Sequence, residues 1–204
     1  METVLATWNP RQAQWIKEGL LKLPIPMRAL FENKVDEVDE SGNTFEENAI
    51  LKANAVQITS ERIIVAEDSG LCVNVLDGNP GVRTARWAPG TDDDRSVKLL
   101  EELKHVTNLA LRAARFKSVV AIRFPDGSSS YTYGELEGRI SFSPRGRLAS
   151  GYSRIFELPS GLTIAENGLP TVKVNDHHLQ ALAMATERIR EWNISHESRG
   201  DSLD

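Results

Sequence analysis

The stretch that most constrains the fold is the aliphatic run Ile63–Ala66, which is followed directly by Glu67-Asp68-Ser69-Gly70. Three β-branched residues and an alanine predict a buried strand that ends at the two carboxylates. Such a strand end would place the acids at one rim of a sheet, where they can hold a hard cation or polarise a water. Ser69 could hydrogen-bond an anion, and Gly70 would let the backbone approach a ligand. The plainer alternative is a polar strand end followed by a turn, because Asp-Ser-Gly is common in turns.

Composition limits the function classes that the chain can serve. Its 204 residues, 40% hydrophobic and 26% charged, suit one α/β domain or two small lobes that share a core. A formal net charge of -5 argues against general binding of nucleic acid or of an anionic membrane. Cys72 is the only cysteine, which excludes an internal disulfide and a cysteine metal cluster. The start of the chain has no basic segment followed by an apolar run, so we expect a cytoplasmic protein.

The N-terminal segment predicts a strand that leads directly into a helix. Thr3–Ala6 reads as a buried strand, Asn9 is a favourable N-cap residue, and Pro10 suits the first helical position. A helix N-terminus directly after a strand offers free backbone N–H groups and the positive end of the helix dipole to an anion. The alternative is a plain strand-to-helix junction without a ligand.

A second helix is predicted from a capping box, in which Thr44 is followed three residues later by Glu47. We expect this helix to run to about Thr59. Thr44, Asn48 and Lys52 recur every four residues and therefore share one helix face. The amide and the ammonium could both reach a phosphate, whereas the alternative for Lys52 is a solvated surface lysine.

The rest of the chain completes a mixed sheet with flanking helices. Two strands, Ala114–Phe124 and Ser128–Gly134, are joined by a Pro-Asp-Gly turn and predict a hairpin. A last helix is expected from Asp176 to about Trp192. We therefore predict one α/β domain over residues 1–193 and a polar, mobile tail over 194–204.

Five blocks of the sequence follow one another in a specific order and spacing: Leu5–Asn9, Glu40–Ala49 with Leu51–Ala53, Ala66–Leu71, Gly78–Val82 with Ala85–Arg86, and Ala114–Phe116. In these blocks the chain resembles the inosine/xanthosine triphosphate pyrophosphatase family, which removes deaminated purine nucleotides from the nucleotide pool. The resemblance implies an elongated α/β fold, with a mixed central sheet and flanking helices that form two lobes around a cleft, and a homodimer.

The reaction that this resemblance implies is Mg²⁺-dependent hydrolysis of a nucleoside triphosphate to the monophosphate and pyrophosphate. Glu40 and Asp68 match the metal positions of the family, and Asp68 also matches its proposed proton acceptor. The residues alone leave the base open between Asp68 and Glu67. The residues that the resemblance and the helix spacing assign to the phosphates are Thr7, Asn9, Asn48, Lys52, Ser69 and Gly70.

The sequence departs from the family pattern in the first loop and in the base pocket. Gln12 stands where the family has a lysine, which removes a cation that neighbouring Arg11 could replace. The family's Phe-Gly-Tyr/Trp-Asp becomes Ser150-Gly151-Tyr152-Ser153, and its Ser-His-Arg becomes Asp176-His177-His178. A family lysine falls on Val172, with Lys173 next to it.

These departures predict a weakened or altered preference for inosine and xanthosine nucleotides. In the family, the lost acid and arginine read the edge of the purine, and a lost donor to a carbonyl typically costs about 1–3 kcal/mol. Tyr152 is expected to stack on the base, and His178 is expected to contact the base or to lie at the helix cap or surface.

Two other functions remain open for this sequence. Gln12 supports a catalytically weak nucleotide-binding or regulatory protein, which would bind nucleotides without turnover. Because Gln12 also removes a cation that would bind phosphate, the site has less need of a triphosphate. The other alternative is therefore a hydrolase that acts on a nucleoside monophosphate. The intact Glu40, Asp68 and Lys52 favour the pyrophosphohydrolase.

Overall fold

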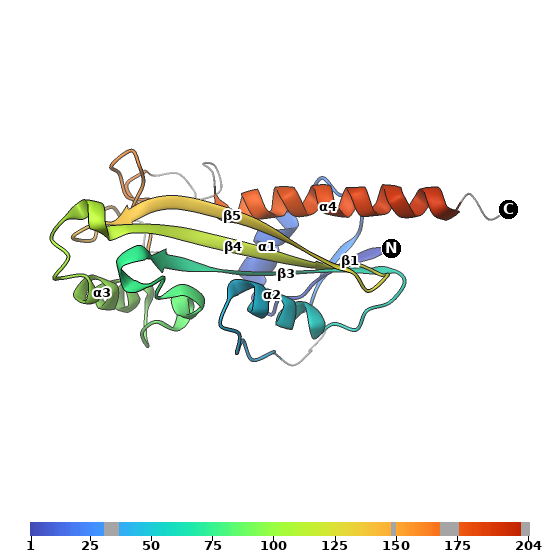
Figure 1. The fold of residues 1–204 in the computed structure, drawn as a ribbon, viewed down its shortest axis with the longest axis horizontal. Coiled ribbons are helices and arrows are strands. Elements are labelled where there is room, and N and C mark those ends of the chain that lie inside the picture. Colours follow the sequence, from blue (N-terminus) through green and yellow to red (C-terminus); the bar gives the residue numbers. More distant parts are fainter. Residues whose placement is uncertain (31–36, 148–149, 168–175, 201–204) are drawn as a thin grey trace. The chain divides into compact units, whose positions relative to one another are not determined.

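The computed structural model describes residues 1–30, 37–147, 150–167 and 176–200 of the chain (Figure 1). The chain divides into two compact units. The first unit consists of Met1–Asp68, Ser118–Gly134 and His178–Asp204, and the second of Ser69–Lys117 and Glu135–His177.

The strands form one six-stranded sheet in the order β2-β1-β3-β4-β5-β6. Strand β1 pairs in parallel with both β2 and β3, whereas β5 pairs antiparallel with β6. The sheet is therefore mixed, which confirms the predicted α/β class. The strands are β1 (Glu2–Leu5), β2 (Met27–Ala29), β3 (Arg62–Val73), β4 (Ala113–Arg123), β5 (Ser129–Ile140) and β6 (Phe156–Glu157).

The helices begin where their caps predict. The side chain of Asn9 accepts hydrogen bonds from the backbone N–H groups of Arg11 and Gln12, and that of Thr44 accepts from Glu47 N–H. The α-helices are α1 (Pro10–Gly19), α2 (Phe45–Asn54), α3 (Asp92–Glu102) and α4 (His177–Gly200). Short 3₁₀ turns in the described residues include η2 (Asn74–Leu76), η3 (Gly81–Arg86) and η4 (Leu109–Arg112).

Two helix ends differ from the prediction. Helix α2 ends at Asn54 rather than near Thr59, and the N–H of Val56 closes it on the carbonyl of Ala53. Helix α4 continues past the expected end at Trp192 to Gly200. A polar sequence can continue a helix, because the backbone bonds do not depend on an apolar face.

Strand β3 does not end at the carboxylates but runs through them to Val73, so the predicted strand end is wrong. Pairing with neighbouring strands overrides the turn preference of Asp-Ser-Gly, as tertiary context commonly does. The shorter β1 ends at Leu5 opposite Val65, so Glu67 and Asp68 lie just beyond its end. The acids therefore still lie where a neighbouring strand stops.

The core of the first unit has a layer on each face of the sheet. Ile63 and Val65 pack with α1 and α4, whereas Ile64 and Ala66 pack with α2. Because successive side chains of a strand point to opposite faces, Glu67 continues the α1/α4 side and Asp68 the α2 side.

The second unit has its own core, built around the later parts of β3 and β5. Arg112 is buried there, and its guanidinium donates to carbonyl oxygens that include those of Ile140 and Ser141. The core residues are Leu71, Val73, Leu99, Leu103, Ala114, Ile140, Tyr152, Ile155 and Phe156.

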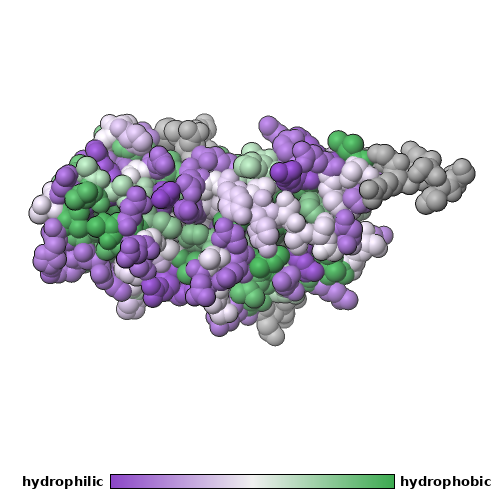
Figure 2. Space-filling model, viewed as in Figure 1, coloured by the Kyte–Doolittle hydropathy of each residue, from purple (hydrophilic) through white to green (hydrophobic). Residues whose placement is uncertain are grey.

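The visible face of the molecule mixes hydrophilic residues with separate small groups of hydrophobic ones (Figure 2). Exposed large hydrophobic side chains such as Leu21, Val97 and Met184 come from different parts of the chain, namely the turn after α1, α3 and α4. In the described part of the chain, no helix has both the length and the apolar character needed to cross a membrane.

Candidate active site

The first cluster joins Glu40, Asn48, Lys52 and Asp68 on the α2 side of the sheet, and we call it the acid–lysine cluster. The ammonium of Lys52 donates to Glu40 Oε1 at 3.0 Å and to Asp68 Oδ1 at 3.2 Å. Asn48 Nδ2 donates to the other oxygen, Asp68 Oδ2, at 3.2 Å. Lys52 is only 4% exposed, so it is not a solvated surface lysine.

The loop that carries Glu40 is attached to α2 through Gly42. The N–H of Gly42 donates to Asn48 Oδ1 at 2.8 Å, so Asn48 links this loop to Asp68. A Cβ on residue 42 would lie 2.6 Å from the same oxygen, which leaves no room for a side chain. The amide of Asn48 thus holds the two carboxylates of the cluster near each other.

Burial and charge act in opposite directions in the acid–lysine cluster. Burial raises the pKa of Asp68 to about 6, although Lys52 and Asn48 oppose the rise. Burial alone would lower the pKa of Lys52, but the carboxylates of Asp68 and Glu40 raise it above its ordinary value. Lys52 therefore stays charged, and the two carboxylates form a set of oxygen donors of the kind that hard cations prefer.

The second cluster surrounds Glu67 on the α1/α4 side of the sheet, and we call it the Glu67 network. Glu67 Oε1 lies 2.7 Å from His178 Nδ1 and accepts from the hydroxyl of Ser118 at 2.6 Å. Gln12 Nε2 donates to Glu67 Oε2 at 2.5 Å and to the Glu67 carbonyl at 2.9 Å. Although burial alone would raise the pKa of Glu67, donation by His178, Ser118 and Gln12 holds it well below its usual range.

The Glu67 network continues to the loop before α1. The hydroxyl of Thr7 donates to Gln12 Oε1 at 2.6 Å and accepts from the N–H of Asn9 at 3.2 Å. Arg11, proposed from sequence as a substitute cation, has its guanidinium over the ring of Trp15, 5.3 Å from the centroid. Arg11 is therefore in the first turn of α1, but its guanidinium is directed along the helix toward Trp15 and away from the N-terminus.

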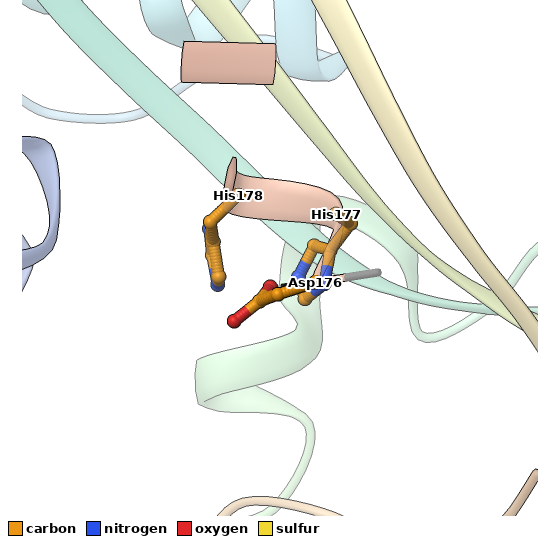
Figure 3. A group of neighbouring side chains, drawn as sticks. All are labelled: Asp176, His177 and His178. Carbon is orange, nitrogen blue, oxygen red and sulfur yellow. Dashed lines mark ion pairs between the residues drawn. The ribbon is translucent and has the colours of Figure 1, made fainter. Parts of the chain in front are cut away.

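His178 lies within the Glu67 network rather than at the surface. Its side chain is 14% exposed, and its ring centroid lies 4.8 Å from that of Trp15. The expected role as a helix cap or surface residue is therefore wrong. Figure 3 shows His178 in the first turn of α4 beside the preceding Asp176 and His177.

Apart from His178, which belongs to the first unit, the described base-pocket residues lie in the second unit. His177 is buried and stacks on Phe116, with ring centroids 5.2 Å apart. Two of the residues assigned to the phosphates, Ser69 and Gly70, lie within β3, where Ser69 is half-buried and Gly70 is buried. Lys173 lies outside the described residues.

The segment Ser150–Ser153 forms a tight turn. The backbone N–H of Ser150 donates to Ser153 Oγ at 3.3 Å, and that of Ser153 donates to the Ser150 carbonyl at 3.1 Å. Gly151 has a φ of 55° and donates its N–H to the carboxylate of Asp92 at 2.6 Å. This positive φ favours glycine at residue 151.

The expected stacking of Tyr152 on a base conflicts with its burial. Tyr152 is 2% exposed and packs in the core of the second unit, where its hydroxyl donates to the carbonyl of Thr84 at 3.0 Å. Its ring therefore has protein neighbours in this structure, because the turn that begins at Ser150 directs it inward.

The protein should lose stability at high pH through Tyr152, and Tyr152→Phe should abolish this part of the loss. Burial raises the pKa of Tyr152 above its ordinary value, so the unfolded chain loses the phenolic proton first as the pH rises. The free energy of unfolding should fall as the pH passes about 10, and the variant should lack this part of the fall. Near neutral pH the variant should lose about 1 kcal/mol with the Thr84 hydrogen bond. Urea unfolding at several pH values measures both, and an identical alkaline slope would contradict the prediction.

Three contributors to these clusters were not predicted from sequence. Ser118 directly precedes the apolar run Val119–Ile122 of β4, and its hydroxyl is a weak signal in the sequence. Trp15 and Gly42 carried no comparable signal, because their partners are distant in the chain or in another element.

Comparisons with known proteins agree with this fold. The pattern of the Ham1 family matches residues 3–188. A non-canonical purine NTP pyrophosphatase homolog of Halalkalibacterium halodurans is 40% identical over 193 residues, covering 94% of this chain and 97% of the relative. A dITP/XTP pyrophosphatase of Symbiobacterium thermophilum is 44% identical over 153 residues, covering 75% of this chain and 77% of the relative.

The structural comparison points to the same family. The solved structure of a HAM1 protein from Coxiella burnetii has a TM-score of 0.82 and 34% identity, covering 94% of this chain and 99% of that one. The resemblance inferred from the five sequence blocks is thereby confirmed, and the chain belongs to the Ham1 family.

Proposed function

We propose that this chain hydrolyses a nucleoside triphosphate to the nucleoside monophosphate and pyrophosphate. The observation that carries the proposal is the acid–lysine cluster, in which Lys52 contacts both Glu40 and Asp68. The curated relatives named dITP/XTP pyrophosphatase support the same reaction class. The function thus follows from a built site together with the family.

The residues of the acid–lysine cluster fit the Mg²⁺ that the family implies. Glu40 and Asp68 offer hard oxygen donors within hydrogen-bond distance of one ammonium, and they would hold the ion. When bound, Mg²⁺ supplies positive charge that offsets the phosphates. Thr7, Asn9 and Lys52 would bind the phosphates themselves, helped by the N-terminus of α1.

We assign the proton acceptor to Asp68 rather than to Glu67. Three side-chain donors occupy the two oxygens of Glu67, and its lowered pKa makes it a poor base near neutrality. Without a bound ion, burial raises the pKa of Asp68 to about 6, so Asp68 is the more basic of the two carboxylates. The adjacent acids therefore have separate roles, with Asp68 accepting the proton of the attacking water.

We also propose that the base preference is weaker than the resemblance implies for the family. Ser153 has no carboxylate to read the purine edge, and the imidazole of His178 lies against Glu67. A site without those groups should discriminate between nucleobases less strongly, by about tenfold to a hundredfold.

The test is a panel of ribo- and deoxyribonucleoside triphosphates, which includes inosine, xanthosine, adenosine, guanosine and the pyrimidines. We expect release of one pyrophosphate per monophosphate in Mg²⁺, with a shallow preference among bases. Strong preference for inosine or xanthosine would refute the altered specificity alone. Nucleotide binding without pyrophosphate release would favour the nucleotide-binding alternative. Activity on nucleoside monophosphates would favour the monophosphate hydrolase.

The resemblance further implies a homodimer, and we propose this state for the chain. Light scattering should then give twice the 22.6 kDa of one chain. A mass of one chain at all concentrations would reject it.

A further inference from the structure

We propose that His178 is a positioning residue for the phosphate-binding loop, acting through Glu67 and Gln12 on Thr7, and that it does not read the base. The inference rests on the proposed function, since it concerns the loop that would hold the phosphates. It gives a role to His178, which sequence alone placed in the base pocket.

A continuous chain of hydrogen bonds connects the start of α4 with the loop before α1. His178 Nδ1 lies 2.7 Å from Glu67 Oε1, and Gln12 Nε2 donates to Glu67 Oε2 at 2.5 Å. Gln12 Oε1 then accepts from the hydroxyl of Thr7 at 2.6 Å. Thr7 Oγ1 in turn accepts from the N–H of Asn9 at 3.2 Å, which is the N-cap of α1.

The chemistry of the groups fixes the direction of each bond. An ionised carboxylate only accepts, so His178 carries its hydrogen on Nδ1 and Gln12 must turn its amide nitrogen toward Glu67. The amide oxygen of Gln12 is thereby directed at Thr7, whose single hydroxyl hydrogen it accepts. Gln12 thus takes the only hydrogen of the Thr7 hydroxyl, so the network would act on phosphate binding by fixing the position of the loop from Thr7 to Asn9, not by presenting this hydroxyl to a phosphate.

Packing fixes the position of the His178 ring as well as its hydrogen bond. The ring lies against Trp15 of α1, with centroids 4.8 Å apart, and the guanidinium of Arg11 covers Trp15. Glu67 is 1% exposed, so loss of the His178 donor leaves a buried anion that must reorient or recruit water. Either response disturbs Gln12, which contacts the same carboxylate.

Two departures from the family pattern, Gln12 and His178, are far apart in the sequence but contact the same carboxylate. Gln12 lies in the first turn of α1 and His178 in the first turn of α4, yet both contact the carboxylate of Glu67. Ser118 completes the set of donors from β4. The substitutions therefore act as one unit rather than as separate changes in phosphate and base binding.

Inorganic tripolyphosphate tests this inference, because it has the phosphates of the substrate but no base. We would measure its binding by calorimetry in EDTA, where no turnover occurs. His178→Ala should weaken binding by about tenfold, as expected for the loss of a hydrogen bond to a charged group. His178→Asn places an amide donor near the position of Nδ1 and should restore binding to within about threefold.

Three further variants complete the design. Gln12→Ala breaks the chain on the other side of Glu67 and should weaken binding similarly, and the double variant should add little to either single change. His196→Ala is the matched control, because His196 lies on the same helix but stacks on Trp192. It should leave tripolyphosphate binding unchanged. Gln12→Ala carries the test if His178→Ala does not fold.

Activity on different bases separates positioning from base reading. The ratio of kcat/KM for inosine and adenosine triphosphates should be the same in His178→Ala and in the unaltered protein. A changed ratio with unchanged tripolyphosphate binding would overturn the inference, as would no tripolyphosphate binding by the unaltered protein. Absence of pyrophosphate release despite the expected binding changes would refute the proposed function and leave the positioning role in place.

Discussion

Asp68→Asn is expected to slow pyrophosphate release by about 10²–10⁴-fold, the usual contribution of a positioned proton acceptor. The amide keeps the shape of the carboxylate but cannot accept a proton near neutral pH. Its single amide oxygen can still accept from one of the two donors around Asp68, the ammonium of Lys52 or the amide of Asn48. The fold should therefore remain, and the loss should appear in kcat measured with saturating nucleotide and Mg²⁺.

The same variant should also remove a pH dependence of stability in EDTA. Burial raises the pKa of Asp68 to about 6, whereas an unfolded aspartate titrates near about 3.9. From about pH 5 to 8 only the folded carboxyl loses its proton, so stability falls by about 1 kcal/mol in the unaltered protein. Asp68→Asn should lack this part of the fall.

Glu67→Gln is the matched comparison for Asp68→Asn, because the two acids are adjacent on β3 but face different clusters. It should reduce stability more and leave a larger fraction of kcat than Asp68→Asn. Full activity in Asp68→Asn, with kcat lost in Glu67→Gln, would reverse the assignment of the base.

Lys52→Met is expected to destabilise the protein by about 3 kcal/mol at pH 8, because it leaves buried Asp68 and nearby Glu40 without their shared cation. For a chain of this length, that corresponds to a fall in Tm of roughly 6–12 °C. Turnover should fall too, since Lys52 is proposed to bind the phosphates. Thermal unfolding in EDTA gives the stability, free of any bound ion.

The double variant Lys52→Met/Asp68→Asn should recover most of the lost stability. Removing the remaining buried charge makes the site neutral apart from Glu40, which is half-buried. Lys104→Met is the control, because Lys104 is exposed and forms an ion pair with Glu101, three residues earlier in the chain. It should change stability by less than about 0.5 kcal/mol. A Tm of Lys52→Met equal to that of this control would show that the acid–lysine cluster is not energetically coupled.

Local signals predicted the parts of the fold that local interactions decide. The caps at Asn9 and Thr44 marked the starts of α1 and α2, because each cap needs only backbone N–H groups two or three residues away. The spacing of Asn48 and Lys52 placed both on one face of α2. The hairpin between β4 and β5 followed from the turn at Asp126-Gly127, where Gly127 has a φ of 86°.

The same signals failed where long-range pairing competes with them. Asp-Ser-Gly reads as a turn, but β3 continues through it because neighbouring strands pair with it. Tyr152 reads as a stacking residue from its family position, yet the core of the second unit encloses its ring. The sequence left open a solvated surface lysine as the alternative for Lys52, and only its contacts with Glu40 and Asp68 exclude that alternative.

The sequence by itself determined which residues are candidates for a phosphate site, namely carboxylates, a lysine and a helix N-terminus, since these residues form family blocks at local spacings. Only the tertiary structure decided which partners each of the two acids contacts. Glu67 and Asp68 are neighbours in the chain, but a strand sends them to opposite faces of the sheet. The partners of Glu67 are 51, 55 and 111 residues away, and only the packing of β3 against β4, α1 and α4 brings them to it.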